Sequence, residues 1–151
     1  MRAVIRTDAS SQIGIGHVMR CLTLADELQY VGCDVLFICG QRDGDMNNYI
    51  TSKGLEVAVI DTPHTKLDTE YDWKLDAKST VSILEHMDNI DWLIVDHYML
   101  DYKWENYVKN SVKSIMVIDD LANRSHRCDL ILDQNYYVDM QKRYNNLVPD
   151  S

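Results

Sequence analysis

Hydrophobic residues in this chain of 151 residues fall into short continuous runs, separated by segments with helical spacing. Continuous runs of this length, rich in β-branched residues, are typical of strands buried on both faces of a sheet. The predicted strands cover residues 3–5, 35–38, 57–60, 92–95, 115–118 and 130–132. Since strands and helices alternate, the pattern predicts an α/β fold with a parallel sheet flanked by helices.

Helical spacing is clearest where apolar side chains recur on one face between residues 18 and 28, and Gly32 follows at the expected end. Further helices are predicted at 45–53, 76–87 and 101–110. Residues 61–76 are polar without a period and predict a long surface loop. The polar tail after Asp133 predicts no further strand.

Composition narrows the class of protein. A chain of this length is expected to form one domain. The net charge of -9 and the pI near 4.8 argue against a nucleic-acid partner, because such proteins concentrate basic side chains on one face. No apolar stretch has the length of a membrane span or of a signal peptide, so we expect a cytoplasmic protein. The four cysteines show no zinc spacing and are expected to be reduced and buried.

Polar residues collect directly after the predicted strands. They are Asp8 with residues 10–11, then residues 96–98, 119–120 and 133–135. In a parallel sheet these positions share the carboxyl edge, where α/β folds bind ligands. Helix capping explains some of the aspartates equally well.

A glycine-bearing turn from Ser11 through Gly14 and Gly16 joins the first strand to the first helix. Its glycines let the backbone approach a ligand closely, and the helix start offers free N–H groups. The turn lacks the third glycine of a dinucleotide fingerprint, and the chain has no P-loop. We therefore expect no NAD, no ATP and no other cofactor.

His17 falls in the first helical turn, where the helix dipole disfavours imidazolium and keeps the ring able to accept a proton. Arg20 lies on roughly the same face and adds to that effect or holds an anionic group. The alternative is that His17 caps the turn and Arg20 is solvated. Spacing alone leaves both open.

The other histidines are weaker candidates. His64 and His86 are expected to be solvated. His97 either positions substrate or makes a structural hydrogen bond to Asp96 or a neighbour, and His126 either contacts phosphate or lies in a surface loop. Since no histidine clusters with Asp, Glu or Cys at ligand spacing, no metal is predicted.

Three segments, 6–25, 95–105 and 118–135, resemble motifs of the PseG family, hydrolases of a UDP-diacetamido-trideoxy-altrose in pseudaminic-acid synthesis. Related spore-coat polysaccharide proteins share these motifs. The resemblance implies that residues 1–151 form the Rossmann-like amino-terminal domain of a two-domain fold of the GT-B type. It also implies that the nucleotide is held mainly by a carboxy-terminal domain missing from this chain.

The resemblance places the family's catalytic histidine on His17 and implies metal-free hydrolysis of a UDP-linked sugar with inversion. Together with the strand-end positions, it predicts a set of substrate-binding residues: Asp8, Ser11, Gly14, Gly16, Arg20, His97, Tyr98, Asp119 and Asn135. Two other functions stay open. One is the acceptor-side domain of a GT-B glycosyltransferase, and the other is a non-catalytic sugar-binding module.

Overall fold

Six parallel strands form one sheet in the computed structural model, which describes residues 1–61 and 71–149 apart from the side chain of Gln141. The spatial order is β3-β2-β1-β4-β5-β6, the order of a Rossmann-type sheet. The strands are β1 (Arg2–Thr7), β2 (Asp34–Gly40), β3 (Glu56–Ile60), β4 (Trp92–Asp96), β5 (Ser114–Ile118) and β6 (Leu130–Leu132). All six predicted strands are confirmed, as is the α/β class with the arrangement expected of a GT-B-type amino-terminal domain.

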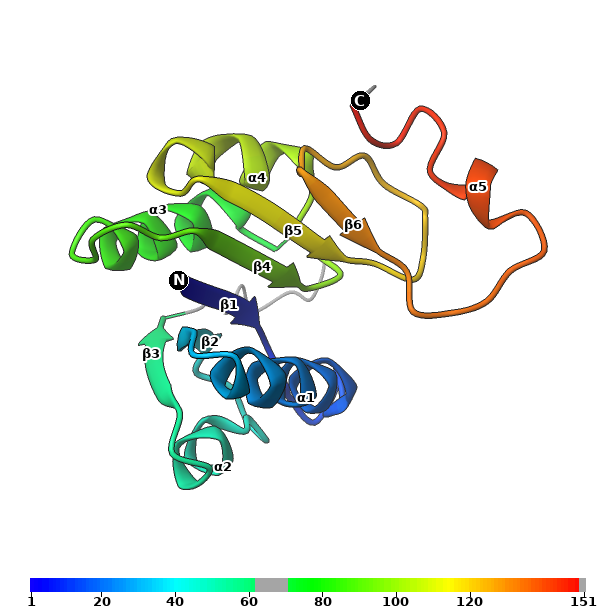
Figure 1. Ribbon diagram of the computed structural model, residues 1–151. Helices are drawn as coiled ribbons and strands as arrows, with labels where there is room; N and C mark the ends of the chain where they lie inside the picture. Colours follow the sequence, from blue (N-terminus) through cyan, green and yellow to red (C-terminus); the bar gives the residue numbers. More distant parts are fainter. Residues whose placement is uncertain (62–70, 150–151) are drawn as a thin grey trace.

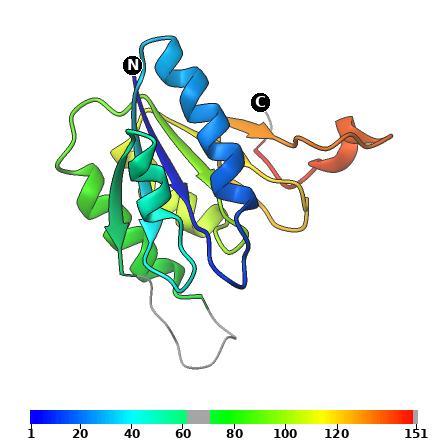
Figure 2. The same ribbon diagram turned by 90° about the horizontal axis from the view of Figure 1, so that it is seen from below.

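Helices cover both faces of the sheet, with α1 and α2 on one side and α3 and α4 on the other (Figure 1). The helices are α1 (Gly16–Tyr30), α2 (Asn47–Ser52), α3 (Trp73–Leu84), α4 (Tyr102–Val108) and α5 (Met140–Arg143), with a 3₁₀ turn at Lys109–Ser111. The single turn α5 extends beyond the β6 edge (Figure 2).

Two apolar cores lie on opposite faces of the sheet. In β1, Ala3 and Ile5 pack with α1, whereas Val4 between them packs on the opposite face with residues of α3 and α4, such as Trp104. This alternation is that of a strand buried on both faces. The central strand is thereby fixed in register, and so is the loop that follows it.

Helix α3 begins at Trp73, three residues before the predicted start at residue 76. The side chain of Asp72 accepts hydrogen bonds from the backbone N–H groups of Lys74 and Leu75 and so caps the helix earlier. The predicted loop is wrong at this end. The rest of it, residues 62–70 with His64, lies outside the described part of the chain.

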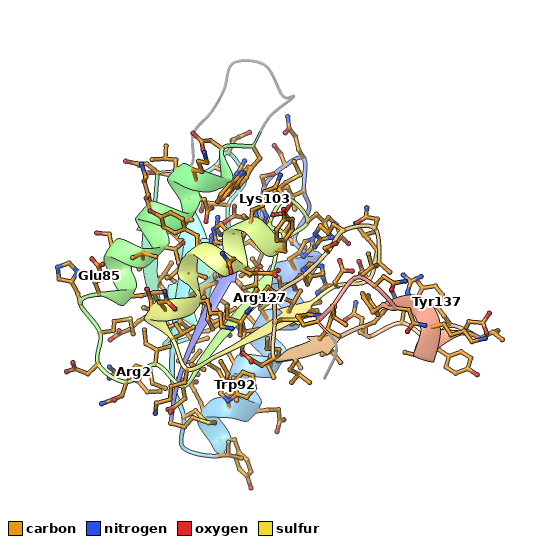
Figure 3. All side chains as sticks on the ribbon, turned by 90° about the horizontal axis from the view of Figure 1, so that it is seen from above. Arg2, Glu85, Trp92, Lys103, Arg127 and Tyr137 are labelled. Carbon is orange, nitrogen blue, oxygen red and sulfur yellow. The ribbon has the colours of Figure 1, made fainter. Side chains whose placement is uncertain are left out.

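The outer strands depart from the expectation that every strand is buried on both faces. In β6 at one edge, Leu130 and Leu132 are 47% and 41% exposed, and in β3 at the other edge Val59 is also exposed. The connection from β5 to β6 contains no helix among the described residues. Figure 3 shows Tyr137, after β6, far to the side of the sheet.

Among the helices of the described residues, none combines the length and the apolar character needed to cross a membrane.

Candidate active site

The carboxyl ends of β1 and β4 define the position of the site. These strands are neighbours in the sheet, with Thr7 opposite Asp96, although two strands separate them in sequence. The chain runs outward from β1 in both directions, which makes this the topological switch point, where open α/β sheets bind ligands. The glycine turn and the start of α1 follow β1 directly at this point.

His17 is 95% buried, and its imidazole contacts a carboxylate at the end of β4. The Nδ1 atom lies 2.5 Å from Oδ1 of Asp96, whose side chain is fully buried. An ionised carboxylate only accepts hydrogen bonds, so His17 donates from Nδ1 in this pair. Burial alone would raise the pKa of Asp96, but hydrogen bonds from Arg20 and His17 hold it below its ordinary value.

The second ring nitrogen of His17, Nε2, forms no hydrogen bond within the described part of the chain. It is not one of the fully buried polar atoms without a partner, which among the described residues are Thr7 Oγ1 and His126 Nε2. With Nδ1 protonated, Nε2 carries a lone pair that can accept a proton.

Arg20 lies one turn after His17 on α1 and contacts two carboxylates. Its Nε and Nη2 donate to the two oxygens of Asp96 at 2.5 and 2.6 Å, and its Nη1 donates to Asp120 at 3.1 Å. These hydrogen bonds raise the pKa of Arg20 above its ordinary value. Arg20 is thus paired inside the protein rather than solvated.

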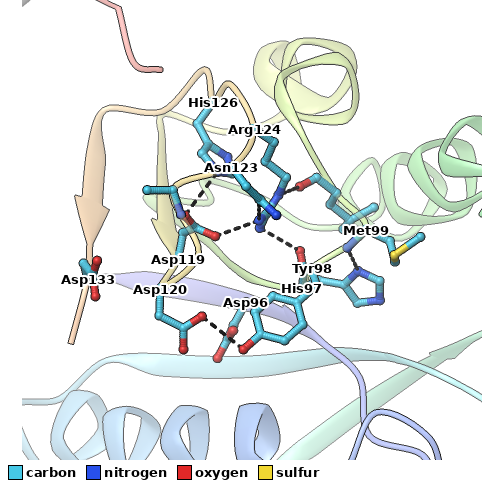
Figure 4. Close-up of polar contacts among 12 residues, drawn as sticks. Asp96, His97, Tyr98, Met99, Asp119, Asp120, Asn123, Arg124, His126 and Asp133 are labelled. Atoms are coloured by element: carbon cyan, nitrogen blue, oxygen red, sulfur yellow. Dashed lines mark hydrogen bonds and ion pairs between the residues drawn. The ribbon is translucent and has the colours of Figure 1, made fainter. Parts of the chain in front are cut away.

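Tyr98 packs against the imidazole of His17. Its ring meets that of His17 edge to face, with centroids 4.3 Å apart. Its hydroxyl donates to Asp120 at 3.0 Å, a contact drawn in Figure 4. Burial, helped by this bond, raises the pKa of Tyr98. Tyr98 and Arg20 therefore both donate to Asp120, and both contact His17.

Asp8 and His97 meet in a second buried pair beside the first. Nε2 of His97 donates to Asp8 at 3.1 Å, because the backbone N–H of Met99 donates to its Nδ1. Asp8 also accepts from Arg6 and from the backbone N–H of Gly40. Burial lowers the pKa of His97, and its hydrogen bond goes to Asp8 rather than to Asp96.

Arg6 lies below this pair, fully buried between two carboxylates. It donates to Asp8 at 2.5 Å and to Asp76 of α3 at 2.5 Å. Asp76 also accepts from the indole N–H of Trp104 and from the hydroxyl of Tyr71. Both carboxylate oxygens of Asp8 therefore accept hydrogen bonds from other residues of the protein.

The glycine turn is open on the ligand side. Gly14 has a φ of +81°, which favours glycine, and no described atom lies within 4 Å of where a Cβ would stand at Gly14 or Gly16. The backbone N–H of Ser11 donates a hydrogen bond to the backbone carbonyl of Asp43. Gly44 lies so close to the backbone of Ser11 that a side chain at position 44 would clash. Helix α1 starts without a side-chain cap, so its first N–H groups stay available.

The remaining predicted residues lie along the same edge but apart from His17. Asp119 is fully buried, accepting from Arg124 at 2.7 Å and from the Ala122 backbone (Figure 4). Asn135 is exposed after β6 and bonds through its backbone N–H to Asp133. Among the predicted site residues, the structure thus brings His17, Arg20 and Tyr98 together, and separately Asp8 and His97.

The surface-loop reading of His126 is wrong. His126 is buried, with Nδ1 2.7 Å from Glu105 of α4, and its backbone N–H donates to Leu147. It anchors the carboxy-terminal segment to α4, which no local pattern in its polar loop indicates. His86 is exposed just after α3, as expected.

The described residues contain no group of three or more His, Cys, Asp or Glu side chains arranged to hold a metal ion. The cysteines at 21, 33 and 39 are buried and Cys128 is half-buried, all with free thiols. Cys21 donates weakly to Asp96 at 3.5 Å. It adds one more hydrogen bond to the carboxylate that holds His17.

The sequence alone did not indicate Asp96 as the partner of His17. The signal was present, because Asp96 directly follows a predicted strand. Using it required knowing that β4 lies beside β1, which is a property of the strand order and not of local sequence. Arg6 and Asp76 were missed because buried charges look like surface charges in sequence.

Fold and site together define a Rossmann-like α/β domain with a histidine–aspartate pair at its switch point. The resemblance drawn from the motifs is confirmed: the chain is similar to the UDP-2,4-diacetamido-2,4,6-trideoxy-beta-L-altropyranose hydrolase of Campylobacter jejuni. The two sequences are 29% identical over an aligned stretch of 151 residues. The alignment covers 99% of this chain and 47% of that hydrolase. The chain thus spans about half the length of this relative. A comparison with models of known protein families finds no match.

Proposed function

We propose that this chain is the domain of a UDP-sugar hydrolase that carries the general base, and that the base is His17. The observation that carries the proposal is the orientation of the imidazole. Nδ1 is fixed on buried Asp96, while Nε2 has no hydrogen-bond partner among the described residues and His17 directly follows the open glycine turn on the ligand-binding edge. Similarity to a hydrolase named for a UDP-linked sugar supports the substrate class.

In the proposed reaction, Nε2 of His17 takes a proton from a water molecule as the water oxygen attacks the anomeric carbon of the sugar. The bond from that carbon to the phosphate oxygen breaks, and its electron pair leaves with UDP. Attack opposite the leaving group inverts the anomeric centre. Because UDP leaves as a stabilised anion, the step needs little help from a general acid, and His17 then releases its proton to solvent.

Asp96 keeps this base competent by holding the proton on Nδ1, and it stabilises the imidazolium that forms when Nε2 is protonated. Tyr98 restricts the ring by its edge-to-face contact. The uncapped N–H groups at the start of α1 lie beside the same turn and favour negative charge on the sugar or phosphate. Each group acts on orientation or charge at the reacting centre.

We further propose that a second domain holds the uridine and most of the diphosphate. Within the described residues, the arginines nearest this edge are already paired with aspartates. The pairs are Arg20 with Asp96 and Asp120, Arg42 with Asp8, Arg124 with Asp119, and Arg143 with Asp133. An anionic nucleotide would have to compete with these carboxylates for its cations.

Replacing His17 by Asn tests the base. In the protein joined to its nucleotide-holding domain, we expect UDP release to fall by about 10²- to 10⁴-fold with KM changed only a few-fold, because a base acts in the transition state. The matched control is His86→Asn, an exposed histidine after α3, which should keep parental turnover. UDP release by His17→Asn at near-parental rate would show that another group is the base.

The bond that breaks is tested by hydrolysis in ¹⁸O-labelled water. Attack at the anomeric carbon puts the label in the sugar, and NMR of the first-formed anomer should show inversion. Label in UDP would place the attack at phosphorus. Transfer to an added sugar acceptor faster than to water would indicate a glycosyltransferase instead.

A further inference from the structure

We propose that Arg20 is a positioning residue that keeps His17 neutral and protonated on Nδ1, and that it does not bind the substrate. The proposal rests on the proposed function insofar as His17 is the base. Its claim about the protonation state of His17 can be tested without any hydrolase activity.

The guanidinium of Arg20 is directed at carboxylates of the protein itself. Arg20 forms a two-point pair with Asp96 through Nε and Nη2, and its remaining nitrogen, Nη1, points to Asp120. Each of the three nitrogens is therefore directed at a carboxylate of the protein. Three of the five N–H groups of the guanidinium thus donate to carboxylates. A phosphate that approached the N–H groups left on Nη1 and Nη2 would meet the negative charge of Asp96 and Asp120, and the pair with fully buried Asp96 is costly to break.

The imidazole of His17 lies beside both a negative and a positive charge. A buried carboxylate alone beside a histidine favours imidazolium, which cannot accept a proton. Here Oδ1 of Asp96 is shared between His17 and Arg20, and Nη2 of Arg20 lies 3.2 Å from Nδ1 of His17. The guanidinium offsets the carboxylate charge and opposes a second positive charge on the ring. The carboxylate still accepts the Nδ1 proton.

Charged and titratable groups facing this pair come from four directions. Arg20, the Cys21 thiol that contacts Asp96, and the positive end of the helix come from α1. Asp96 comes from β4, Tyr98 from the loop after β4, and Asp120 from the loop after β5. Asp120 lies on the far side of the guanidinium and partly offsets it. Removing Arg20 and removing Asp120 should therefore change the proton affinity of His17 in opposite directions.

Histidine-labelled NMR of the 151-residue chain tests this directly. In Arg20→Met, His17 should hold its proton to higher pH, by about 1 to 3 pH units. In Asp120→Asn, its titration should move to lower pH, because the guanidinium then lacks its second partner. Arg20→Lys keeps the charge and should restore most of the parental titration. A general loss of structure would not produce shifts of opposite sign.

Arg42→Met is the matched control. Arg42 is an arginine of similar exposure at the same edge, paired with Asp8 instead of Asp96, so the titration of His17 should stay at the parental pH. Unchanged titration of His17 in Arg20→Met, or a shift to lower pH, overturns the proposal. So does an equal shift in Arg42→Met.

Kinetics separate the proposal from substrate binding by Arg20. With measurable UDP-sugar hydrolysis, Arg20→Met should move the acid limb of the pH profile of kcat/KM upward by the shift seen in NMR, with KM little changed at high pH. A raised KM with an unmoved pH profile would make Arg20 a substrate-binding residue. If the NMR shift occurs but His17→Asn leaves hydrolysis intact, the assignment of Arg20 stands and the base assignment fails.

Discussion

The chemistry of His17 depends on which of its two ring nitrogens carries the proton. An isolated imidazole exchanges its proton between them, and only the form protonated on Nδ1 offers Nε2 as a base. The buried carboxylate of Asp96 selects that form at a distance of 2.5 Å. At the residue scale, the site is therefore a pair whose second member has no need to touch substrate.

Replacing Asp96 by Asn should lower kcat of the proposed hydrolase by about 10²-fold or more, with KM changed only a few-fold. The amide leaves the ring free to carry its proton on Nε2, and it turns a donor toward Arg20 or His17. Kinetics of Asp96→Asn beside Asp91→Asn, an aspartate at the opposite edge of the sheet, check this. A parental kcat in Asp96→Asn would remove Asp96 from the mechanism.

The sequence alone predicted His17, Arg20 and Tyr98 as residues of one site. It did not show which residues their side chains contact. Helical spacing placed His17 and Arg20 on one face, which the structure confirms. The partners Asp96 and Asp120 lie at the end of β4 and in the loop after β5, 76 and 100 residues away from Arg20. Contacts over such separations follow from strand order, which local pattern does not encode.

At the scale of elements, β1 carries an arginine one residue beyond the apolar run predicted at 3–5. Arg6 is fully buried, and it links its own strand to α3 through Asp76, which in turn accepts from Trp104 of α4. The network thus joins β1 to the two helices on one face. Arg6 also donates to Asp8, which accepts a hydrogen bond from His97. His97 directly follows Asp96 in the sequence.

Replacing Asp76 by Ala should reduce the free energy of unfolding by about 3–5 kcal/mol, because it leaves a buried guanidinium with one carboxylate fewer. Urea denaturation measures this. The control is Asp34→Ala, which breaks the exposed Arg2–Asp34 pair at 2.8 Å and should cost less than about 1 kcal/mol. Equal losses in both variants would mean that the buried network adds nothing specific.

The same network predicts a pH dependence. Burial opposes ionisation of Asp76, but Arg6 holds its pKa below the ordinary value. A carboxyl group whose pKa is lowered by folding contributes stability above its unfolded pKa of about 4, and this contribution is lost as the pH falls through the folded pKa. The difference between parent and Asp76→Ala should therefore be full at neutral pH and should shrink below about pH 4.

Element boundaries show what local sequence encodes well. All six strands were predicted because continuous apolar runs of that length usually form buried strands in an α/β chain. The start of α3 was misplaced because the capping aspartate, Asp72, lies among other polar residues that give no period. The exposure of β6 was missed because a strand at the sheet edge has the same apolar sequence as a central one.

At the scale of the whole molecule, the charge on the ligand-binding edge is balanced internally. Within the described residues, the four arginines nearest this edge pair with aspartates, so their charge is not free for a diphosphate, and the chain carries a net charge of -9. A site whose nearest arginines are paired with aspartates can still place a base and a water molecule beside a sugar. It is poorly suited to hold the nucleotide that the sugar is attached to.

We therefore expect the 151-residue chain to fold alone but to hydrolyse UDP-sugars at no detectable rate. Folding follows from two apolar cores on either side of a six-stranded sheet. Hydrolysis needs the sugar aligned with the water on Nε2 of His17, and positioning of this kind supplies roughly 7–11 kcal/mol of a barrier. Without a domain that binds the nucleotide, that energy is missing. Circular dichroism should show cooperative unfolding of the chain, while UDP release is compared at equal concentration with the protein joined to its nucleotide-holding domain. Comparable turnover by the chain alone would show that the nucleotide site lies within these residues, and that the paired arginines exchange their aspartates for phosphate when substrate binds.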